Sequence, residues 1–188
     1  MVLLSRIYTK SGDKGKTALG DGERIFKDHH RIEAIGEVDE ANTFIGWALQ
    51  FCTGEEKVLL QKIQNNLFDL GADLCVKDNE NTINKLRVTK EQVIFLETMI
   101  DGYNQSLPHL TSFVLPGGTE LATALHLVRT VVRRAERRVV TLSQKDDINP
   151  EIIKYLNRLS DLLFVLARFS NHQSPKVGDV LWVPGTNQ

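Results

Sequence analysis

The segment from residue 118 to 144 constrains the fold of this chain most strongly. Its apolar residues recur every three or four positions, a spacing that a helix with 3.6 residues per turn gathers into one narrow stripe. The stripe contains Leu121, Leu125, Val128, Val132, Ala135 and Val139. Because such a stripe has to be buried against other elements, the segment predicts a long central helix that packs against further helices.

The same segment carries five arginines within ten residues, along the edges of the apolar stripe. They are Arg129, Arg133, Arg134, Arg137 and Arg138. The first two fall beside Glu136 on one edge, and Arg134 and Arg138 fall on the far flank. A guanidinium at such an edge either covers the core with its aliphatic stem or binds a phosphate or carboxylate. Because crowded guanidinium groups repel one another, the cluster favours an anion or carboxylates among them.

Length and charge limit the classes of function. A chain of 188 residues suits a single domain over 1–188. It contains 23 basic and 24 acidic residues and has a net charge of -1, which gives no overall attraction to nucleic acid or to an acidic membrane. The arginine cluster is therefore local, and this favours a small anionic ligand over a polyanion.

Two further observations predict a cytoplasmic protein. We find no pattern of a secretory signal near the N-terminus and no apolar run long enough to span a membrane. Cys52 and Cys75 lack the spacing of a redox or metal motif and fit reduced residues of a core. A disulfide between them remains an open alternative from the sequence.

Helical periodicity also occurs outside the central segment. We expect four more helices, over residues 31–51, 55–76, 89–102 and 150–172. Thr89 and Gln92 have the spacing of a capping box, and Pro150 suits the first position of a helix. The sequence therefore predicts an all-α fold, an up-and-down five-helix bundle over 31–172 with short connections. Residues 1–30 then form an N-terminal arm and loop, and 173–188 an irregular tail.

The loop over residues 9–17, TKSGDKGKT, has the chemistry of a phosphate cradle. Gly12 and Gly15 allow backbone amides to converge on one ligand, while the lysines add positive charge and the threonines add hydroxyl donors. Lys27 is a further candidate phosphate contact. The loop is not a Walker A motif, because Lys10 occupies the place of its first glycine. The alternative is a solvated surface turn.

Single residues on other segments complete the set of candidates. Asp39, at the margin of the first helix, calls for a cation, and an arginine of the central helix is the natural one; the alternative is a solvated acid. Asn157, Asp161 and Phe164 share one side of a mostly buried helix, so the two polar residues require partners. Phe113 precedes a Pro-Gly-Gly turn and is either a rigid aromatic contact or ordinary core.

Several chemistries are disfavoured by the residues present. The chain has no Glu-x-x-His pair for a di-iron centre, no Cys/His cluster for zinc and no nucleophile elbow. What remains is a glycine and lysine loop, an arginine helix and an Asn/Asp helix, none of which supplies a nucleophile. From the residues alone we expect a site for a nucleoside polyphosphate with Mg²⁺.

Five motifs occur in an order that resembles a known family. They are YTKSGDKG at 8–15, GEVDE at 36–40, FVLPGG at 113–118, RTVVRRAER at 129–137 and NRLSD at 157–161. In this order they resemble the PduO-type ATP:cob(I)alamin adenosyltransferases over about residues 6–170. The tail after residue 171 carries no matching motif. The resemblance implies a ferritin-like five-helix bundle that forms homotrimers, with each active site between neighbouring subunits.

The resemblance also implies which residues bind ATP. In the N-terminal loop they are Thr9, Lys10, Ser11, Gly12, Thr17, Ala18 and Lys27. On the helices they are Arg133, Arg134, Ala135, Glu136, Arg137, Asn157 and Asp161. Family members often have a hydroxyl residue where this chain has Ala18, which argues against a side-chain contact there. Arg133 matches the arginine that contacts the polyphosphate, while Glu136 and Asp161 match supporting residues.

The remaining implied roles concern the subunit boundary and the corrinoid. Asp39 matches an acid that pairs across subunits with the arginine equivalent to Arg129, and Phe113 matches the aromatic that displaces the lower axial base of cobalamin. Phe164 is expected beside it. The implied reaction transfers the 5′-deoxyadenosyl group of ATP to Co(I), with a corrinoid reductase and a B12-dependent enzyme as partners. The alternative is a non-catalytic helical sensor or scaffold that binds ATP or a corrinoid.

Overall fold

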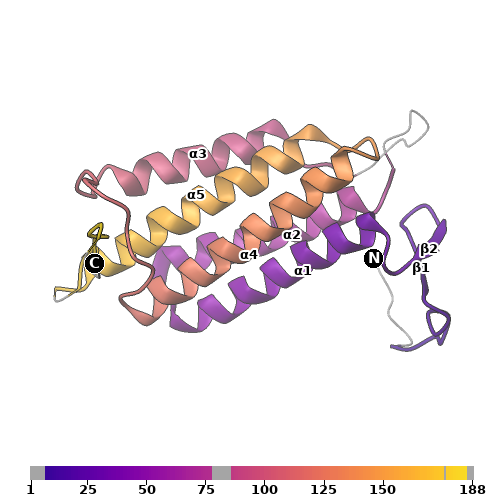
Figure 1. Cartoon of the computed structure of the whole chain (residues 1–188), viewed down its shortest axis with the longest axis horizontal. Coiled ribbons are helices and arrows are strands. Elements are labelled where there is room, and N and C mark those ends of the chain that lie inside the picture. Colours follow the sequence, from indigo (N-terminus) through magenta and orange to yellow (C-terminus); the bar gives the residue numbers. More distant parts are fainter. Residues whose placement is uncertain (1–6, 78–85, 176, 186–188) are drawn as a thin grey trace.

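The computed structural model describes residues 7–77, 86–175 and 177–185 and confirms the predicted five-helix bundle (Figure 1). The helices are α1 (His30–Ala48), α2 (Gly54–Leu74), α3 (Lys90–Asn104), α4 (Glu120–Ser143) and α5 (Pro150–Gln173). A 3-10 turn over Leu49–Phe51 follows α1, where the periodicity had suggested further α-helix. No helix in the described ranges has both the length and the apolar character needed to cross a membrane.

Local sequence signals set the helix ends. The side chain of Gln92 accepts a hydrogen bond from the backbone N–H of Thr89 at 2.9 Å, as the capping box requires. Asn149 caps α5, and Pro150 occupies its first turn. At the start of α4, the Thr119 hydroxyl accepts from the Ala122 N–H at 3.1 Å. These caps satisfy backbone donors that a helix leaves unpaired at its first turn.

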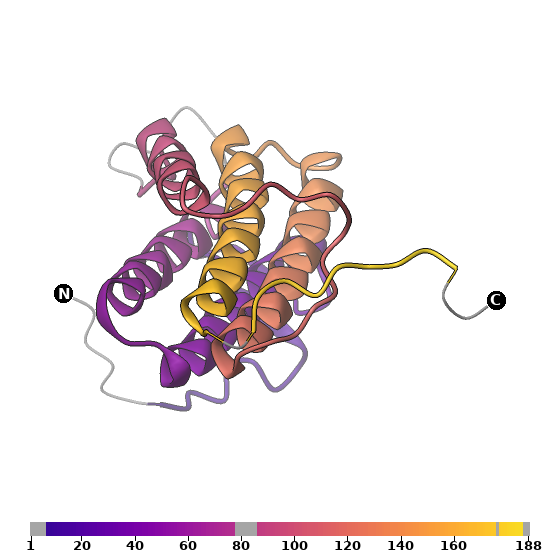
Figure 2. The ribbon, with the colours of Figure 1, turned by 90° about the vertical axis from the view of Figure 1, so that its left-hand side faces the viewer.

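The helix predicted from the apolar stripe packs between two other helices of the bundle. α4 packs between α1 and α5, and α3 packs on α5 (Figures 1 and 2). α2 packs against α1 and also reaches α3, where Gln92 Nε2 donates to Asn66 Oδ1 at 3.2 Å. The stripe residues Leu125, Val128, Val132, Ala135 and Val139 are all buried, and Leu121 packs against the same core. The burial of this stripe therefore fixes which face of α4 points inward and which edges reach the surface.

The connection from α3 to α4 is not short, in contrast to the sequence prediction. Because α5 separates these two helices, residues 105–119 cross the end of the bundle to reach the start of α4 (Figure 2). This crossing connection carries Phe113 and pairs with the C-terminal tail. The N–H of Leu115 donates to the carbonyl of Val180 at 2.8 Å, and the N–H of Trp182 donates to the carbonyl of Phe113 at 2.7 Å.

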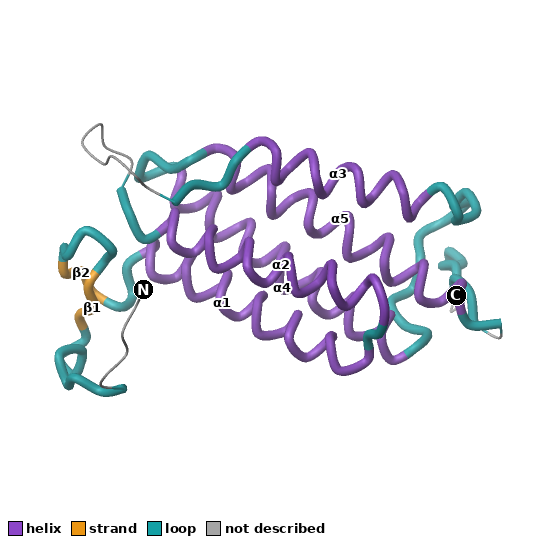
Figure 3. The backbone as a smooth tube through the Cα atoms, turned by 180° about the vertical axis from the view of Figure 1, so that it is seen from behind, coloured by secondary structure: helices purple, strands orange, loops and turns teal. Residues whose placement is uncertain are grey.

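The N-terminal loop contains a hairpin that the sequence did not predict. β1 (Lys16–Ala18) and β2 (Arg24–Phe26) pair antiparallel, with Thr17 opposite Ile25. The hairpin is held to the end of α2, because the N–H of Gly20 donates to the carbonyl of Cys75 at 3.0 Å. It lies beyond the end of the bundle where α1 begins (Figures 1 and 3). Cys75 and the buried Cys52 both carry free thiols, so no disulfide joins them.

Candidate functional site

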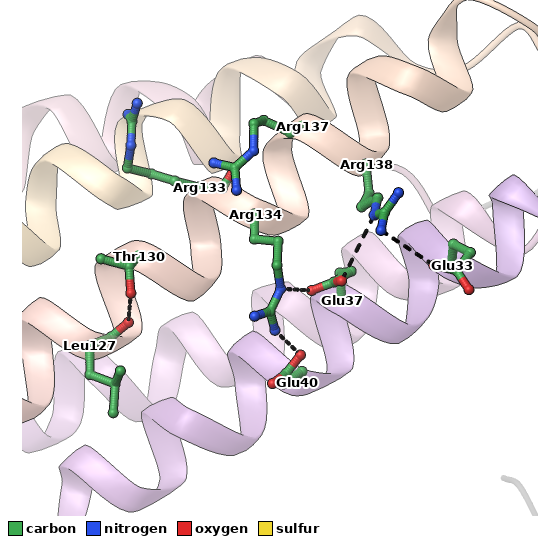
Figure 4. A network of polar contacts seen from close by, with 9 residues as sticks. All are labelled: Glu33, Glu37, Glu40, Leu127, Thr130, Arg133, Arg134, Arg137 and Arg138. Atoms are coloured by element: carbon green, nitrogen blue, oxygen red, sulfur yellow. Dashed lines mark hydrogen bonds and ion pairs between the residues drawn. The ribbon is translucent and has the colours of Figure 1, made fainter.

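The arginines of α4 separate into two sets with different surroundings. Arg134 donates from Nε to Glu37 Oε2 at 2.5 Å and also pairs with Glu40, both on α1 (Figure 4). Arg138 lies 3.9 Å from a Glu33 carboxylate oxygen. The hydrogen bonds to Glu37 and Glu40 raise the pKa of Arg134 above its ordinary value. The structure therefore places Arg134, predicted as an ATP ligand, in an ion-pair network between α1 and α4.

Arg133 and Arg137 form the second set and point away from α1 (Figure 4). Both are exposed, and within the part of the chain that the structure describes neither makes an ion pair. The only hydrogen bond between them runs from Arg137 Nη1 to the carbonyl of Arg133, at 3.1 Å. Two guanidinium groups one helical turn apart, neither in ion-pair contact with a described carboxylate, are placed to bind an anion.

Arg129 lies one turn before Arg133 and is partly buried. Its Nε atom is shielded from solvent and finds no hydrogen-bond partner among the described residues. Burial lowers the pKa of Arg129, and the nearby charge of Arg133 lowers it further. A shielded N–H donor without a partner is unfavourable, so the Nε atom of Arg129 calls for an acceptor from outside the chain segments described.

Asp39 makes no ion pair with α4 within one chain, so the expected pairing with an arginine of the central helix is not formed inside a single subunit. The carboxylates of α1 that contact α4 are Glu33, Glu37 and Glu40. Asp39 is exposed and makes no ion pair in the described ranges. It lies instead at an apolar groove of about 430 Å³ between α1 and α2, which Ile35 and Phe68 also line.

Asn157 meets α4 as predicted, but through a carboxylate and not an arginine. Its Nδ2 donates to Glu136 Oε1 at 3.0 Å, while its Oδ1 accepts from Arg158 at 2.6 Å. Both halves of the amide are thereby oriented, and Arg158 is in turn held by Glu97 of α3 at 2.9 Å. Asp161, expected to need a buried partner, is exposed and makes no hydrogen bond within the described residues.

The loop over residues 9–18 is ordered by contacts of its own. Thr9 and Ser11 share a hydrogen bond between their hydroxyls at 2.7 Å. Arg24 Nη2 donates to the carbonyl of Ser11 at 2.6 Å, a role that the sequence did not reveal. A Cβ built on Gly12 would lie 3.2 Å from Lys27 Nζ, so the absence of a side chain lets this ammonium approach the loop. No contact in the described ranges joins this loop to Arg133 or Asn157.

A hollow of about 770 Å³ lies where the crossing connection, the tail and α4 meet. Its lining consists of Leu110, Thr111, Ser112, Phe113, Val114, Arg129, Phe164 and Trp182. Phe113 is 77% exposed, so it is not ordinary core. Its ring centroid lies 6.0 Å from that of Trp182. An exposed aromatic wall beside a partly buried arginine suits a large, flat ligand with an apolar face.

Known proteins are similar to this chain in sequence and in architecture. The sequence profile of the family described as cobalamin adenosyltransferase matches residues 7–170. The chain belongs to this family. It is 45% identical to the corrinoid adenosyltransferase of Bacillus subtilis, covering 93% of this chain and 91% of that protein. It is 43% identical to human corrinoid adenosyltransferase MMAB, covering 89% of this chain and 69% of that protein.

Solved structures of the family give the same result for the fold. A variant of the PduO-type ATP:corrinoid adenosyltransferase from Lactobacillus reuteri, complexed with cobalamin and ATP, superposes with a TM-score of 0.89 at 38% identity. The comparison covers 95% of this chain and 97% of that one. The resemblance drawn from the five motifs is therefore confirmed.

Two residues beside the family motifs escaped the sequence reasoning. Trp182 lies in a tail without periodicity, and only its pairing with the crossing connection brings it to Phe113. His126 is buried on α4, its ring centroid 6.1 Å from that of Phe164, and both ring nitrogens lack a partner in the described residues. Burial and the charge of Arg129 lower the pKa of His126, which favours the neutral form of the imidazole. The sequence indicates this position only through the spacing of three residues between His126 and Arg129, which places both side chains on the same face of a helix.

Proposed function

We propose that this protein transfers the 5′-deoxyadenosyl group of ATP to the Co(I) of a corrinoid such as cobalamin, releasing triphosphate. Family membership supports the class of reaction, and the Lactobacillus reuteri relative binds both cobalamin and ATP. One observation carries the proposal for this chain. Arg129 lines the aromatic hollow, and Arg133, which makes no ion pair among the described residues, follows four residues later on α4, about 6 Å along the helix axis. A phosphate site and a site for a flat ligand are thus adjacent.

The reaction requires no nucleophile from the protein, in keeping with the residues found. The electron pair of Co(I) attacks C5′ of ATP, the Co–C bond forms, and the C5′–O bond breaks. Triphosphate leaves with the bonding electrons, and cobalt becomes formally Co(III). Arg133, Arg137 and Lys27 stabilise the negative charge that develops on the leaving oxygen and the phosphates. The oriented amide of Asn157 and the carboxylate of Glu136 hold the nucleoside end of ATP.

Mg²⁺ enters the proposal as part of the nucleotide complex. The described residues contain no group of three or more His, Cys, Asp or Glu side chains placed to hold a metal ion. The phosphate oxygens of ATP therefore supply its main ligands, and the ion helps to neutralise the triphosphate.

We assign each site to two subunits of a homotrimer, because the two halves of the candidate site do not meet within one chain. The loop over residues 9–18 of one subunit would complete the nucleotide site on α4 and α5 of its neighbour. Asp39 of the first subunit would pair with Arg129 of the second. Asp39 and Arg129 each lack an ion-pair partner among the described residues of their own chain. The apolar groove beside Asp39 provides a surface that a neighbouring subunit would bury.

Phe113 is assigned to the lower face of the corrin ring. A phenyl ring cannot ligate cobalt, and its exposed position in the hollow lets it occupy the place of an axial base. Without an axial ligand the cobalt is four-coordinate and easier to reduce to Co(I). Phe164 from α5 supports the same apolar wall. In a cytoplasmic setting, a corrinoid reductase would supply the electron, and a B12-dependent enzyme would receive the product.

The test is a spectroscopic assay. Purified protein is mixed with ATP, Mg²⁺ and chemically reduced cobalamin, and conversion to the adenosylated form is followed in the visible spectrum. We expect turnover that depends on both substrates. Binding of ATP by calorimetry without turnover would support the alternative of a nucleotide sensor. Absence of both binding and turnover would leave only a scaffold.

A further inference from the structure

Arg168 connects the two segments that wall the aromatic hollow. This residue is on α5, and its side chain is 4% exposed. Its Nη2 donates to the carbonyl of Pro108 in the crossing connection at 2.7 Å, and its Nε donates to Asp179 Oδ2 in the tail at 2.9 Å. The Asp179 side chain is 7% exposed and also contacts His172 at 3.1 Å. One buried guanidinium therefore holds two segments that are far apart in the sequence.

The two held segments pair with each other a few residues further on. Beyond the backbone bonds between Phe113 and Trp182 and between Leu115 and Val180, the hydroxyl of Ser112 donates to the carbonyl of Trp182 at 2.7 Å. Pro108 precedes Phe113 by five residues, and Asp179 precedes Trp182 by three. Phe113 and Trp182, two of the three aromatic side chains that line the hollow, thus depend on the same anchor.

A second contact fixes the end of the crossing connection and does not reach the hollow. Asn171 on α5 donates to the carbonyl of Gly117 at 3.0 Å and accepts from the N–H of Thr119 at 2.9 Å. These bonds hold the entry to α4 independently of Arg168. Loss of the Arg168 contacts would therefore release the stretch between Pro108 and Gly117, while α4 stays in place.

We propose that Arg168, through its ion pair with Asp179, is a positioning residue that sets the placement of Phe113 against Trp182 in the hollow. The inference rests on the proposed function in taking the hollow as the corrinoid site. It assigns Arg168 to the corrinoid half alone. Asn157 precedes Arg168 by eleven residues on α5, about 16 Å along the helix axis, so the nucleotide half is remote from the anchor.

The first experiment uses Asp179→Asn, which removes the charge from the buried pair and preserves the shape. The chain has two tryptophans, so the Trp47→Phe background leaves Trp182 as the only indole that reports fluorescence. We expect Asp179→Asn to lower the fluorescence anisotropy of Trp182 and shift its emission to the red without ligands. With substrates, the KM for the corrinoid should rise about tenfold, while the KM for ATP stays within about twofold.

A matched control separates positioning from general stability. Arg31 on α1 is also buried and likewise bonds one backbone carbonyl and one carboxylate, Leu74 at 2.8 Å and Asp146 at 3.1 Å, at the other end of the bundle. Arg168→Met and Arg31→Met should both lower the melting temperature. Only Arg168→Met should alter Trp182 emission and the KM for the corrinoid; equal effects of both variants on these readouts would overturn the inference.

The fluorescence measurement also separates this inference from the proposed function. It requires no turnover, so a wild-type protein without transferase activity would refute the function and leave the anchor testable. If Arg168→Met fails to fold, the isosteric Asp179→Asn variant decides. Unchanged emission and anisotropy of Trp182 in Asp179→Asn would overturn the positioning role of Arg168, whatever the activity.

Discussion

The two edges of α4 carry the same residue type and differ in what surrounds it. On the edge facing α1, Arg134 and Arg138 contact carboxylates of their own chain. On the other edge, Arg129, Arg133 and Arg137 make no ion pair in the ranges that the structure describes. Consecutive arginines such as Arg133 and Arg134 therefore meet different surroundings on one helix. One set joins two helices of the bundle, and the other is available for an external anion.

The strongest test of this difference is the truncation of one arginine on each edge. Arg133→Ala should lower kcat/KM by about 100- to 1,000-fold, because a donor to the developing charge is lost. Its stability should hardly change, since alanine is the better helix former. Steady-state kinetics and thermal unfolding measure the two effects.

Arg138→Ala is the matched control, with the same change one and a half turns away on the paired edge. This variant should retain transferase activity within a few-fold of that of the wild type. If both variants lose activity equally, the two edges do not differ in function.

The second test removes the proposed partner of the unpaired edge. Asp39→Asn should lower activity about tenfold or more and weaken the trimer, because it leaves Arg129 uncompensated in the subunit interface. Analytical ultracentrifugation and kinetics report the two effects. Glu33→Gln, on the same helix but facing Arg138 of its own chain, should leave assembly intact. A stable, fully active Asp39→Asn trimer would contradict the assignment.

The third test weakens the paired edge. Glu37→Gln disrupts contacts to both Arg134 and Arg138 and should cost about 1 kcal/mol or less of unfolding free energy, since these arginine side chains are 40% and 50% exposed. Urea unfolding measures the loss, which high salt should diminish. Transferase activity should remain near that of the wild type; a drop of tenfold would show that the paired edge also serves catalysis.

The smallest expected effect concerns pH and His126, which neighbours the unpaired edge. The pKa of this imidazole in the folded chain lies below its ordinary value of 6.5, because burial and Arg129 outweigh the opposite effect of Asp179. As pH falls below about 6.5, the His126 imidazole binds a proton more readily in the unfolded chain than in the folded chain. The part of the unfolding free energy that depends on the neutral imidazole is present above that pH and is lost below it.

His126→Gln should reduce the fall in melting temperature between neutral and mildly acid pH by about 2–4 °C. An identical pH profile for His126→Gln and the wild type would mean that this histidine is protonated equally in both states.

The sequence predicted what depends on local periodicity and on motifs. The stripe of α4 fixed its buried face, and Thr89 and Pro150 marked helix starts correctly. The pairing of Arg134 with Glu37 and Glu40 was beyond reach, because it depends on the rotation of α1 against α4 and joins residues almost a hundred positions apart. Trp182 was missed for a different reason, because pairing between two irregular segments leaves no periodic signal in the sequence.

The separation of the nucleotide loop from Arg133 within one chain has a genetic consequence. If each site takes its loop from one subunit and its arginines from the next, a defect in either half inactivates every site of a uniform trimer. A mixed trimer, however, contains at least one interface at which two intact halves meet. Two alleles that are each inactive, one altered in the loop and one in α4, should therefore complement each other when expressed together.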